Sequence, residues 1–367
     1  MLMSTFDTST NKAICVLPWV HEFKHLNSRT APCCMAQSLK SNETMGMVRE
    51  QMLAGVQPDA CKVCYKMEEH TNYSKRIKET TDWMQKFAEP SIDSPSLEFI
   101  DLRFDATCNL KCKTCGPLSS TLWQKEKRIK YPQVLDTKKY FENIDKSKLK
   151  KVYLAGGEPT YIPAYLDFLN ELYEVNKNCE VIINTNLKRL PNPWKYIMAK
   201  FKNCTVVCSC DAINELGCYV RYPLEWQQFA ENIKWVSENV NYLVFNLVAS
   251  NLTIHKVKET CDWMTQYSKG VNLYVLSDPE CFTIQAIPTD VRQTYIEELE
   301  KIKKHPIDIN FVTQFRSEVD MLLQTLTKDN HDPILTKALQ NELTEQDSHR
   351  STKLAHVDEF LYSWVYR

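Results

Sequence analysis

The segment from residue 97 to 117, LEFIDLRFDATCNLKCKTCGP, constrains this chain more than any other. Its first eight residues are rich in Leu, Ile and Phe and then give way to small and polar residues, which predicts a strand over 97–104. Three cysteines follow at the spacing C-x3-C-x2-C, namely Cys108, Cys112 and Cys115. A loop this short can bring three thiolates to one face of an iron–sulfur cluster, for which thiolates are the usual ligands.

Two other interpretations of this loop are three unrelated buried thiols and a zinc site completed from a distance. Structural zinc sites are closed by four ligands, and no fourth Cys or His lies within twenty residues on either side of the loop. Three ligands on a four-iron cluster leave one iron open, where a substrate or a cofactor can coordinate. The loop therefore favours a cluster.

A second segment follows about forty residues later, where KVYLA at 151–155 predicts another strand. This strand ends in Gly156, Gly157, Glu158 and Pro159. The whole chain has 7 glycines, whereas an average usage of about 7% would give about 26. Adjacent glycines directly after a strand permit close backbone approach, and a proline then suits the first turn of a helix.

Together the two motifs resemble those of the radical S-adenosylmethionine (radical SAM) enzymes, over roughly residues 97–285. The resemblance implies that the three cysteines bind a [4Fe–4S] cluster whose fourth iron chelates the amino acid end of SAM. It also implies that the GGE segment, Gly156, Gly157 and Glu158, contacts the methionyl amine.

Strands and helices are predicted to alternate after residue 96, which indicates βα units and a parallel sheet. The predicted strands are 97–104, 151–155, 180–184, 204–210, 242–249 and 271–276, and the predicted helices are 118–130, 163–175, 192–201, 224–238 and 254–267. Six such units suit the partial (β/α)6 barrel that the resemblance implies. The fold class is therefore α/β, with a helical region from residue 286 onward.

In βα barrels the active site lies at the carboxyl ends of the strands. Thr185 and Asp211 stand at such positions, and Arg221 follows the fourth predicted strand. The resemblance implies that these strand ends contact SAM. Asp211 and Thr185 could instead cap the following helices. Arg221 could hold a carboxylate of SAM or of the substrate through a bidentate contact, or could lie on the surface.

The N-terminal region, residues 13–75, holds five cysteines in a loop-rich pattern: Cys15, Cys33, Cys34, Cys61 and Cys64. Two dispersed cysteines and a C-x2-C pair suffice for one site with four ligands. The residue pattern alone leaves zinc and an iron–sulfur cluster open.

The same region resembles the twitch or SPASM-type auxiliary cluster domains of radical SAM enzymes. The resemblance lies in C-x2-PW, PCC and C-x2-C, followed by Glu68, Ser74 and Arg76. It implies a second [4Fe–4S] cluster. The ligands would be Cys15, Cys33, Cys61 and Cys64, with Cys34 as the alternative to Cys33.

Composition argues against a nucleic-acid-binding or membrane-spanning protein. The net charge of -1 provides no global field for nucleic acid, and no apolar run approaches the ~18 residues of a membrane span. Fifteen cysteines without an export signal indicate reduced thiols and metal ligation in a cytosolic protein.

From these observations we expect three regions. They are an auxiliary cluster module with its linker over 1–95, a radical SAM barrel over 96–285 and a helical region over 286–367. The expected activity is reductive cleavage of SAM and hydrogen abstraction from a peptide or protein, with an electron donor such as flavodoxin or ferredoxin. The alternatives are a radical SAM enzyme acting on RNA, a nucleotide or another small molecule, and a non-catalytic metal-binding scaffold.

Overall fold

The computed structural model describes residues 4–25, 30–71, 73–103, 105–131, 136–268, 270–304, 309–328 and 330–367. Residue 104, the last of the first predicted strand, lies outside these ranges. The chain forms two compact units, which are described separately. The first comprises Met1–Ala106, Pro132–Ile183 and Tyr196–Cys204, and the second comprises Thr107–Tyr131, Asn184–Lys195 and Thr205–Arg367.

Seven strands form one sheet whose order follows the chain from β1 to β7. Their bounds are β1 (His21–His25), β2 (Phe99–Arg103), β3 (Lys151–Leu154), β4 (Glu180–Thr185), β5 (Cys204–Ser209), β6 (Tyr242–Ala249) and β7 (Gly270–Val275). The pairs β1–β2, β2–β3, β3–β4, β5–β6 and β6–β7 are parallel. Within the described residues β1 and β7 are the two edges, so the barrel is open, and the predicted fold class is confirmed.

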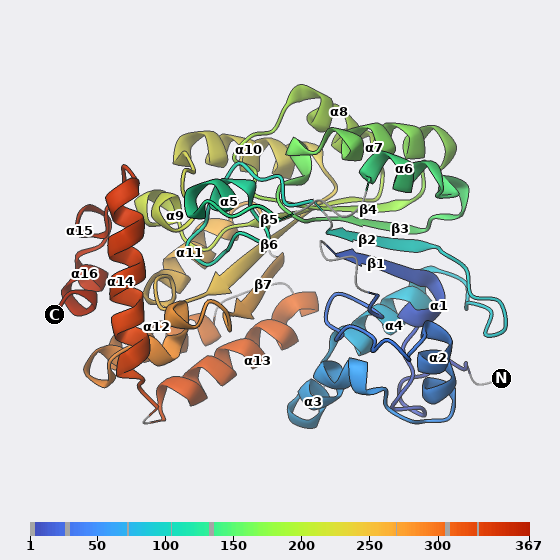
Figure 1. Ribbon diagram of the computed structural model, residues 1–367, viewed down its shortest axis with the longest axis horizontal. Helices are drawn as coiled ribbons and strands as arrows, with labels where there is room; N and C mark the ends of the chain where they lie inside the picture. The colour runs from blue at the N-terminus through green and yellow to red at the C-terminus, as the bar shows by residue number, and fades with distance from the viewer. Residues whose placement is uncertain are drawn as a thin grey trace. The chain divides into compact units, whose positions relative to one another are not determined.

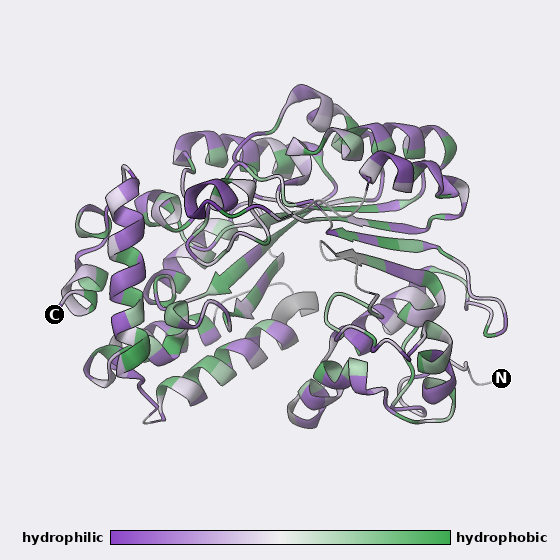
Figure 2. Cartoon of the chain, in the orientation of Figure 1, coloured by the Kyte–Doolittle hydropathy of each residue, from purple (hydrophilic) through white to green (hydrophobic). Residues whose placement is uncertain are grey.

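Strands β2 to β7 are mostly apolar, because both faces of a parallel sheet are usually covered by helices. Val152 and Leu154 of β3 are fully buried, as are Val181 and Ile183 of β4. In the second unit, β5 to β7 are largely coloured as hydrophobic, whereas much of α14 is hydrophilic (Figure 2). The two-residue period of burial along β4 leaves its alternate side chains, among them Asn184, partly exposed.

All six predicted strands are present, and β1 is an additional strand. Its sequence, His-Glu-Phe-Lys-His, has one apolar residue flanked by charged and titratable ones, so local pattern does not predict a strand. The residues of β1 have little intrinsic preference for a strand, and parallel pairing with β2 holds them in one. In this pairing Phe23 lies opposite Asp101. The extra strand thus comes from the N-terminal region, ahead of the first predicted βα unit.

The helices of the first unit lie on both sides of its strands, with α6 and α7 on one side and α1 to α4 on the other (Figure 1). Their bounds are α1 (Leu17–Val20), α2 (Met45–Leu53), α3 (Lys62–His70), α4 (Lys75–Lys86), α6 (Thr137–Glu142) and α7 (Pro163–Val175). Thr44 and Ser74 cap α2 and α4 by accepting backbone N–H groups. Phe6, Trp19 and Trp83 form part of the core beneath them.

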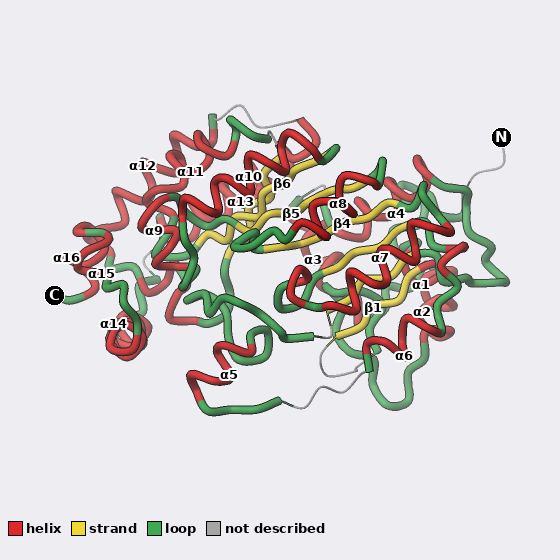
Figure 3. The backbone as a smooth tube through the Cα atoms, turned by 90° about the horizontal axis from the view of Figure 1, so that it is seen from above, coloured by secondary structure: helices red, strands yellow, loops and turns green. Residues whose placement is uncertain are grey.

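In the second unit, helices cover the strands β5 to β7. Helix α10, for example, lies beside β5 and β6 (Figure 3). The bounds of the helices of this unit are α5 (Thr121–Lys127), α9 (Asn214–Val220), α10 (Trp226–Asn239), α11 (Val257–Met264), α12 (Arg292–Lys303), α13 (Ile309–Leu326), α14 (Pro333–His349), α15 (Leu354–Val357) and α16 (Glu359–Val365). A further helix, α8 (Asn192–Lys200), has residues in both units. The region from residue 286 is helical, as predicted, and α13 packs against β7.

Helices α6 and α9 were not predicted, because both are short and lie between stronger patterns. Helices α1, α3 and α4 were not predicted either, so the N-terminal region is more helical than its expected loop-rich pattern. Among the helices of the described residues, none combines the length and the apolar character needed to cross a membrane.

Candidate functional site

The three cysteines of the C-x3-C-x2-C motif lie on an irregular loop that precedes α5, in the second unit. Within it the backbone N–H of Cys115 donates to the carbonyl of Cys112 at 3.1 Å. The N–H of Leu110 lies 3.4 Å from the Cys108 Sγ and donates to it. These contacts curl residues 107–117 back on themselves. We call this segment the cluster loop.

Helix α5 supports the cluster loop through two side chains. Ser120 caps the helix by accepting the N–H of Trp123, and its hydroxyl donates to the carbonyl of Leu110 at 2.6 Å. The indole Nε1 of Trp123 donates to the carbonyl of Cys112 at 2.9 Å. Both supporting side chains are buried. Trp123 was not predicted as a site residue, because nothing in the local sequence pattern distinguishes it from a core tryptophan.

The cluster loop is also hydrogen-bonded to the end of α9 and to the segment that follows it. The N–H groups of Lys111 and Lys113 donate to the carbonyls of Tyr222 and Val220, each at 2.7 Å. Backbone groups that are paired in this way need no water. The loop is therefore held by main-chain bonds as well as by side chains.

The thiols of the cluster loop are partly buried and are influenced by the Arg221 guanidinium. Burial raises the pKa of Cys112 to about 12, and the Arg221 guanidinium opposes that rise. Burial also raises the pKa of Cys115. A cysteine ligates metal as the thiolate, so metal uptake by this loop must release protons. A nearby fixed guanidinium favours that charged form.

Arg221 and Asp211, two of the predicted SAM-contacting residues, lie together and form an ion pair. The Nη1 of Arg221 donates to Asp211 Oδ2 at 2.8 Å, and Asp211 Oδ1 accepts the N–H of Val248 at 3.0 Å. Burial by itself would lower the pKa of Arg221, but Cys112 and Asp211 raise it above its usual value. Within the described residues the buried Nε of Arg221 has no hydrogen-bond partner. The pair therefore leaves one strong donor available beside the cluster loop.

Thr185 and its neighbour Asn186 lie at the end of β4. The Oγ1 of Thr185 accepts the N–H of Leu187 at 3.1 Å, so this buried hydroxyl shapes the turn after the strand. The amide of Asn186 donates to Asn109 Oδ1 at 2.8 Å and lies 3.9 Å from Cys108 Sγ. Asn109, which follows the predicted ligand Cys108, is thus hydrogen-bonded to the residue that follows β4. No local sequence pattern indicated this contact.

The Gly156–Gly157–Glu158 segment lies in the first unit, directly after β3. Gly156 has a φ of 112°, and a Cβ there would lie 2.7 Å from the carbonyl oxygen of Asp105. Gly157 donates its N–H to that same oxygen at 2.8 Å. Glu158 is fully buried and accepts the N–H and hydroxyl of Thr160, at 3.1 and 2.7 Å. The requirement for glycine is therefore clearest at Gly156.

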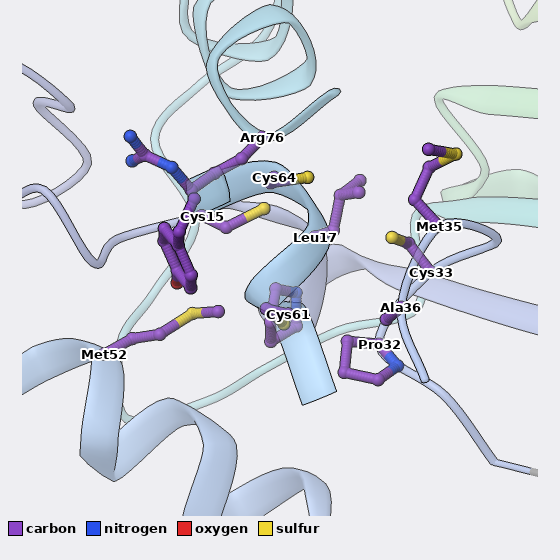
Figure 4. Close-up of a pocket in the computed structure, with 12 residues that line it drawn as sticks. Cys15, Leu17, Pro32, Cys33, Met35, Ala36, Met52, Cys61, Cys64 and Arg76 are labelled. Atoms are coloured by element: carbon purple, nitrogen blue, oxygen red, sulfur yellow. The ribbon is translucent and has the colours of Figure 1, made fainter. Parts of the chain in front are cut away.

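The N-terminal cysteines line one pocket of the first unit (Figure 4). Its walls include all four predicted ligands, Cys15, Cys33, Cys61 and Cys64, together with Met52, Tyr65 and Arg76. Cys34, the alternative to Cys33, is not among the lining residues. Burial raises the pKa values of Cys15 and Cys61 to about 12. We call this feature the four-cysteine pocket.

Glu68, Ser74 and Arg76, which the sequence singled out beside these cysteines, lie together. Arg76 donates to Glu68 Oε1 through Nε at 2.9 Å and to Oε2 through Nη2 at 2.5 Å. Its Nη1 donates to the carbonyl of Ile14 at 2.7 Å, next to Cys15. The hydroxyl of Ser74 also donates to Glu68. The side chain of Arg76 is only 2% exposed, so its charge is fixed at the pocket wall.

In the described residues, no three His, Cys, Asp or Glu side chains are grouped so that they could hold a metal ion. Ligands of a single zinc ion lie about 2.3 Å from one point, whereas the ligands of a polynuclear cluster each bind a different iron. The donor sets of the cluster loop and the four-cysteine pocket, which are entirely thiol, fit iron–sulfur chemistry.

Residues 104–264 match the family described as the Radical SAM superfamily. This range contains the cluster loop, the Gly156–Glu158 segment and the Asp211–Arg221 ion pair. Residues 104–264 therefore form a radical SAM domain, which is a domain of enzymes. No curated protein sequence matches the chain.

Solved structures with a similar fold include SuiB from Streptococcus suis, at 19% identity and a TM-score of 0.40, over 55% of this chain and 45% of that one. SuiB bound to the precursor peptide SuiA matches at 16% identity and a TM-score of 0.44, over 71% and 64%. The enzyme anSMEcpe with bound AdoMet matches at 17% identity and a TM-score of 0.41, over 56% and 57%. This chain thus spans less than two thirds of the length of each of these structures.

Proposed function

We propose that this protein is a radical SAM enzyme that reductively cleaves SAM and abstracts hydrogen from a peptide or protein. The observation that carries the proposal is the cluster loop, which presents three cysteine thiols within a matched radical SAM domain. When bound, a [4Fe–4S] cluster and SAM would supply the electron and the 5′-deoxyadenosyl radical, which is the cofactors' own chemistry. The protein supplies binding, orientation and shielding.

The residues of the second unit have separate tasks in this proposal. Cys108, Cys112 and Cys115 hold the cluster. Asp211 keeps the Arg221 guanidinium in place, and the unpartnered Nε of Arg221 can donate to an anionic group of SAM or of the substrate. Thr185 fixes the turn at the end of β4 through the N–H of Leu187.

The GGE segment is proposed to receive the methionyl amine of SAM. Gly156 brings the backbone after β3 close to the carbonyl of Asp105, an approach that a Cβ would prevent. Glu158 is buried and holds the following turn through Thr160. In this assignment glycine permits the backbone conformation in which this strand end is presented to SAM.

The four-cysteine pocket is proposed to hold a second [4Fe–4S] cluster, which makes residues 1–95 a twitch or SPASM-like module. Four thiols line this pocket, and Arg76 places a fixed positive charge beside them. That charge would partly offset the negative charge of a thiolate-bound cluster. Cys33, which lines the pocket, is the proposed ligand in preference to Cys34.

The peptide or protein substrate follows from the resemblance to auxiliary-cluster enzymes. The proposed electron donor is a flavodoxin or a ferredoxin, and the proposed location is the cytosol. Mass spectrometry of peptides encoded beside the gene, treated with and without the enzyme, identifies the substrate and the altered bond. A peptide that gains no mass change in the presence of SAM and reductant is excluded as the substrate.

The test of the activity is production of 5′-deoxyadenosine by anaerobically reconstituted protein given SAM and dithionite. Cys112→Ala should abolish production, because a cluster with three ligands has no spare thiolate. Cys261→Ala is the matched control, since Cys261 is also buried but lies in α11 and serves only the core. Undiminished production by the folded Cys112→Ala protein would refute the assignment.

A further inference from the structure

The cluster loop carries a lysine that the proposed chemistry does not use. Lys113 lies between Cys112 and Cys115 in the sequence, yet its side chain is 0% exposed. A buried ammonium is costly unless it is paired and hydrogen-bonded. Its position therefore requires a partner.

The partner of Lys113 comes from α14, more than 200 residues later in the chain. The Nζ of Lys113 lies 3.2 Å from Asp347 Oδ1 and 3.1 Å from Gln346 Oε1. It also lies 3.8 Å from the centre of the Tyr219 ring, which stabilises a cation over its face. The ammonium is thus enclosed by an acid, an amide and an aromatic ring.

Asp347 joins three segments of the second unit. Besides Lys113, its carboxylate accepts the hydroxyl of Tyr219 at 3.1 Å and the N–H of Leu354 at 2.8 Å. These donors belong to the cluster loop, to α9 and to the first residue of α15. Breaking a buried pair leaves an uncompensated charge, so these segments cannot separate independently at low cost.

A second connection between α14 and the cluster loop lies beside the first. Arg350 follows α14, has a side chain that is 0% exposed, and donates to Glu126 Oε1 at 3.1 Å. Glu126 also pairs with Lys111 of the cluster loop. The Arg350 guanidinium lies 4.8 Å from the ring centre of Trp123, whose indole donates to the Cys112 carbonyl. Two independent connections thus reach the same loop.

We propose that the end of α14 is a clamp that positions the cluster loop, with Lys113 and Asp347 as its positioning residues. This assigns a role to the C-terminal helical region, to which neither the sequence nor the radical SAM match assigned one. An effect of the clamp on a bound cluster rests on the proposed function. The contacts between α14 and the cluster loop do not depend on a cluster being bound. Removing one member of a buried ion pair also destabilises the whole fold, so the positioning of the cluster loop is measured separately from global unfolding.

The test compares Asp347→Asn with Glu345→Gln in the full-length chain, before and after reconstitution. Glu345 also joins α14 to α5, through an ion pair with Lys127 at 2.8 Å, but its side chain is 55% exposed. Losing this exposed pair should leave hydrogen exchange of the cluster loop unchanged. Hydrogen exchange of peptides covering 107–117 is measured against peptides of β5 to β7. Asp347→Asn should accelerate exchange of the cluster loop by about tenfold or more, which is about 1.4 kcal/mol of local opening.

After reconstitution, Asp347→Asn should also release iron to a chelator faster than Glu345→Gln and broaden the EPR signal of the reduced cluster. Unchanged exchange of the cluster loop would overturn the proposal, as would acceleration that is equal in every peptide. If Asp347→Asn does not fold, Tyr219→Phe removes only the hydroxyl that binds Asp347 and is judged by the same comparison. A wild-type chain that takes up no iron would refute the proposed function. Hydrogen exchange of the cluster loop would then still show whether α14 holds this loop in place.

Discussion

Arg76 binds both carboxylate oxygens of Glu68 and, through its remaining nitrogen, the carbonyl of Ile14. Two parallel bonds fix the plane of the guanidinium as well as its position. Since Ile14 precedes Cys15, this arrangement ties the charge to the backbone that carries a proposed cluster ligand. Arg76 also lies 5.6 Å from the centre of the Tyr65 ring, another residue of the pocket wall.

Arg76→Lys should therefore impair the four-cysteine pocket, because an ammonium cannot make the bidentate contact. We expect a loss of about 2 kcal/mol in the free energy of unfolding and less iron after reconstitution. Denaturant unfolding and iron analysis measure both. Arg49→Lys is the control, since Arg49 makes one bond to the Pro18 carbonyl in the same unit. Equal behaviour of the two variants would contradict the role given to Arg76.

Gly156→Ala should destabilise the segment after β3. The φ of 112° and the 2.7 Å approach to the Asp105 oxygen both oppose a side chain, and such backbone strain costs about 1–3 kcal/mol. SAM binding, measured by equilibrium dialysis, should weaken as well. Gly116→Ala, where a Cβ meets nothing within 4 Å, should leave stability unchanged. Wild-type stability and SAM affinity in Gly156→Ala would rule out this role.

Replacing Cys61 and Cys64 together by alanine should halve the iron content. Two four-iron clusters give about eight iron per chain, against about four for the cluster loop alone. Reductive cleavage of SAM should persist, because the cluster loop has its own ligands, whereas substrate turnover should fall. Iron and sulfide analysis and 5′-deoxyadenosine production measure these outcomes.

The matched control for that double variant is Cys179→Ala with Cys204→Ala, two buried cysteines of the first unit that do not line the pocket. This control should keep all its iron. A wild-type chain with four iron and one zinc would replace the auxiliary cluster with a structural zinc site.

Glu318→Gln should change how stability depends on pH. Burial on α13 raises the pKa of Glu318 to about 7, so the folded state favours the protonated acid. The free energy of unfolding of the wild-type chain should therefore fall as pH rises from 4.5 through 7, because Glu318 must ionise while buried. The glutamine variant has no such group and should not show this fall. Above pH 7 the free energy of unfolding of the variant should exceed that of wild type by about 1–2 kcal/mol, a figure reduced to allow for the partial exposure of Glu318. Below pH 4.5 the two should be equal.

Denaturant unfolding across this pH range measures the difference. Glu300→Gln, on the exposed side of α12, is the control and should follow wild type. A difference that grows toward low pH would have the wrong sign and would contradict the prediction.

Much of the fold could be predicted because its signals are local. The strands from β2 to β7 were predicted, since buried parallel strands form apolar runs that need no partner to be recognised. The strand β1 was not, because His21–His25 has no such run and becomes a strand only through pairing with β2. Similarly, Asp211 and Arg221 were predicted as separate contacts, and only the structure shows them as one ion pair.

By itself, the sequence determined the chemistry that this chain can carry, because the spacing of Cys108, Cys112 and Cys115 and the adjacent glycines are properties of short segments. Tertiary structure decided which distant groups surround them. It brought Cys15, Cys33, Cys61 and Cys64 to one pocket, and it placed Asp347 against Lys113. The physical reason is that a buried charge must find its partner in space, and that partner can stand anywhere along the chain.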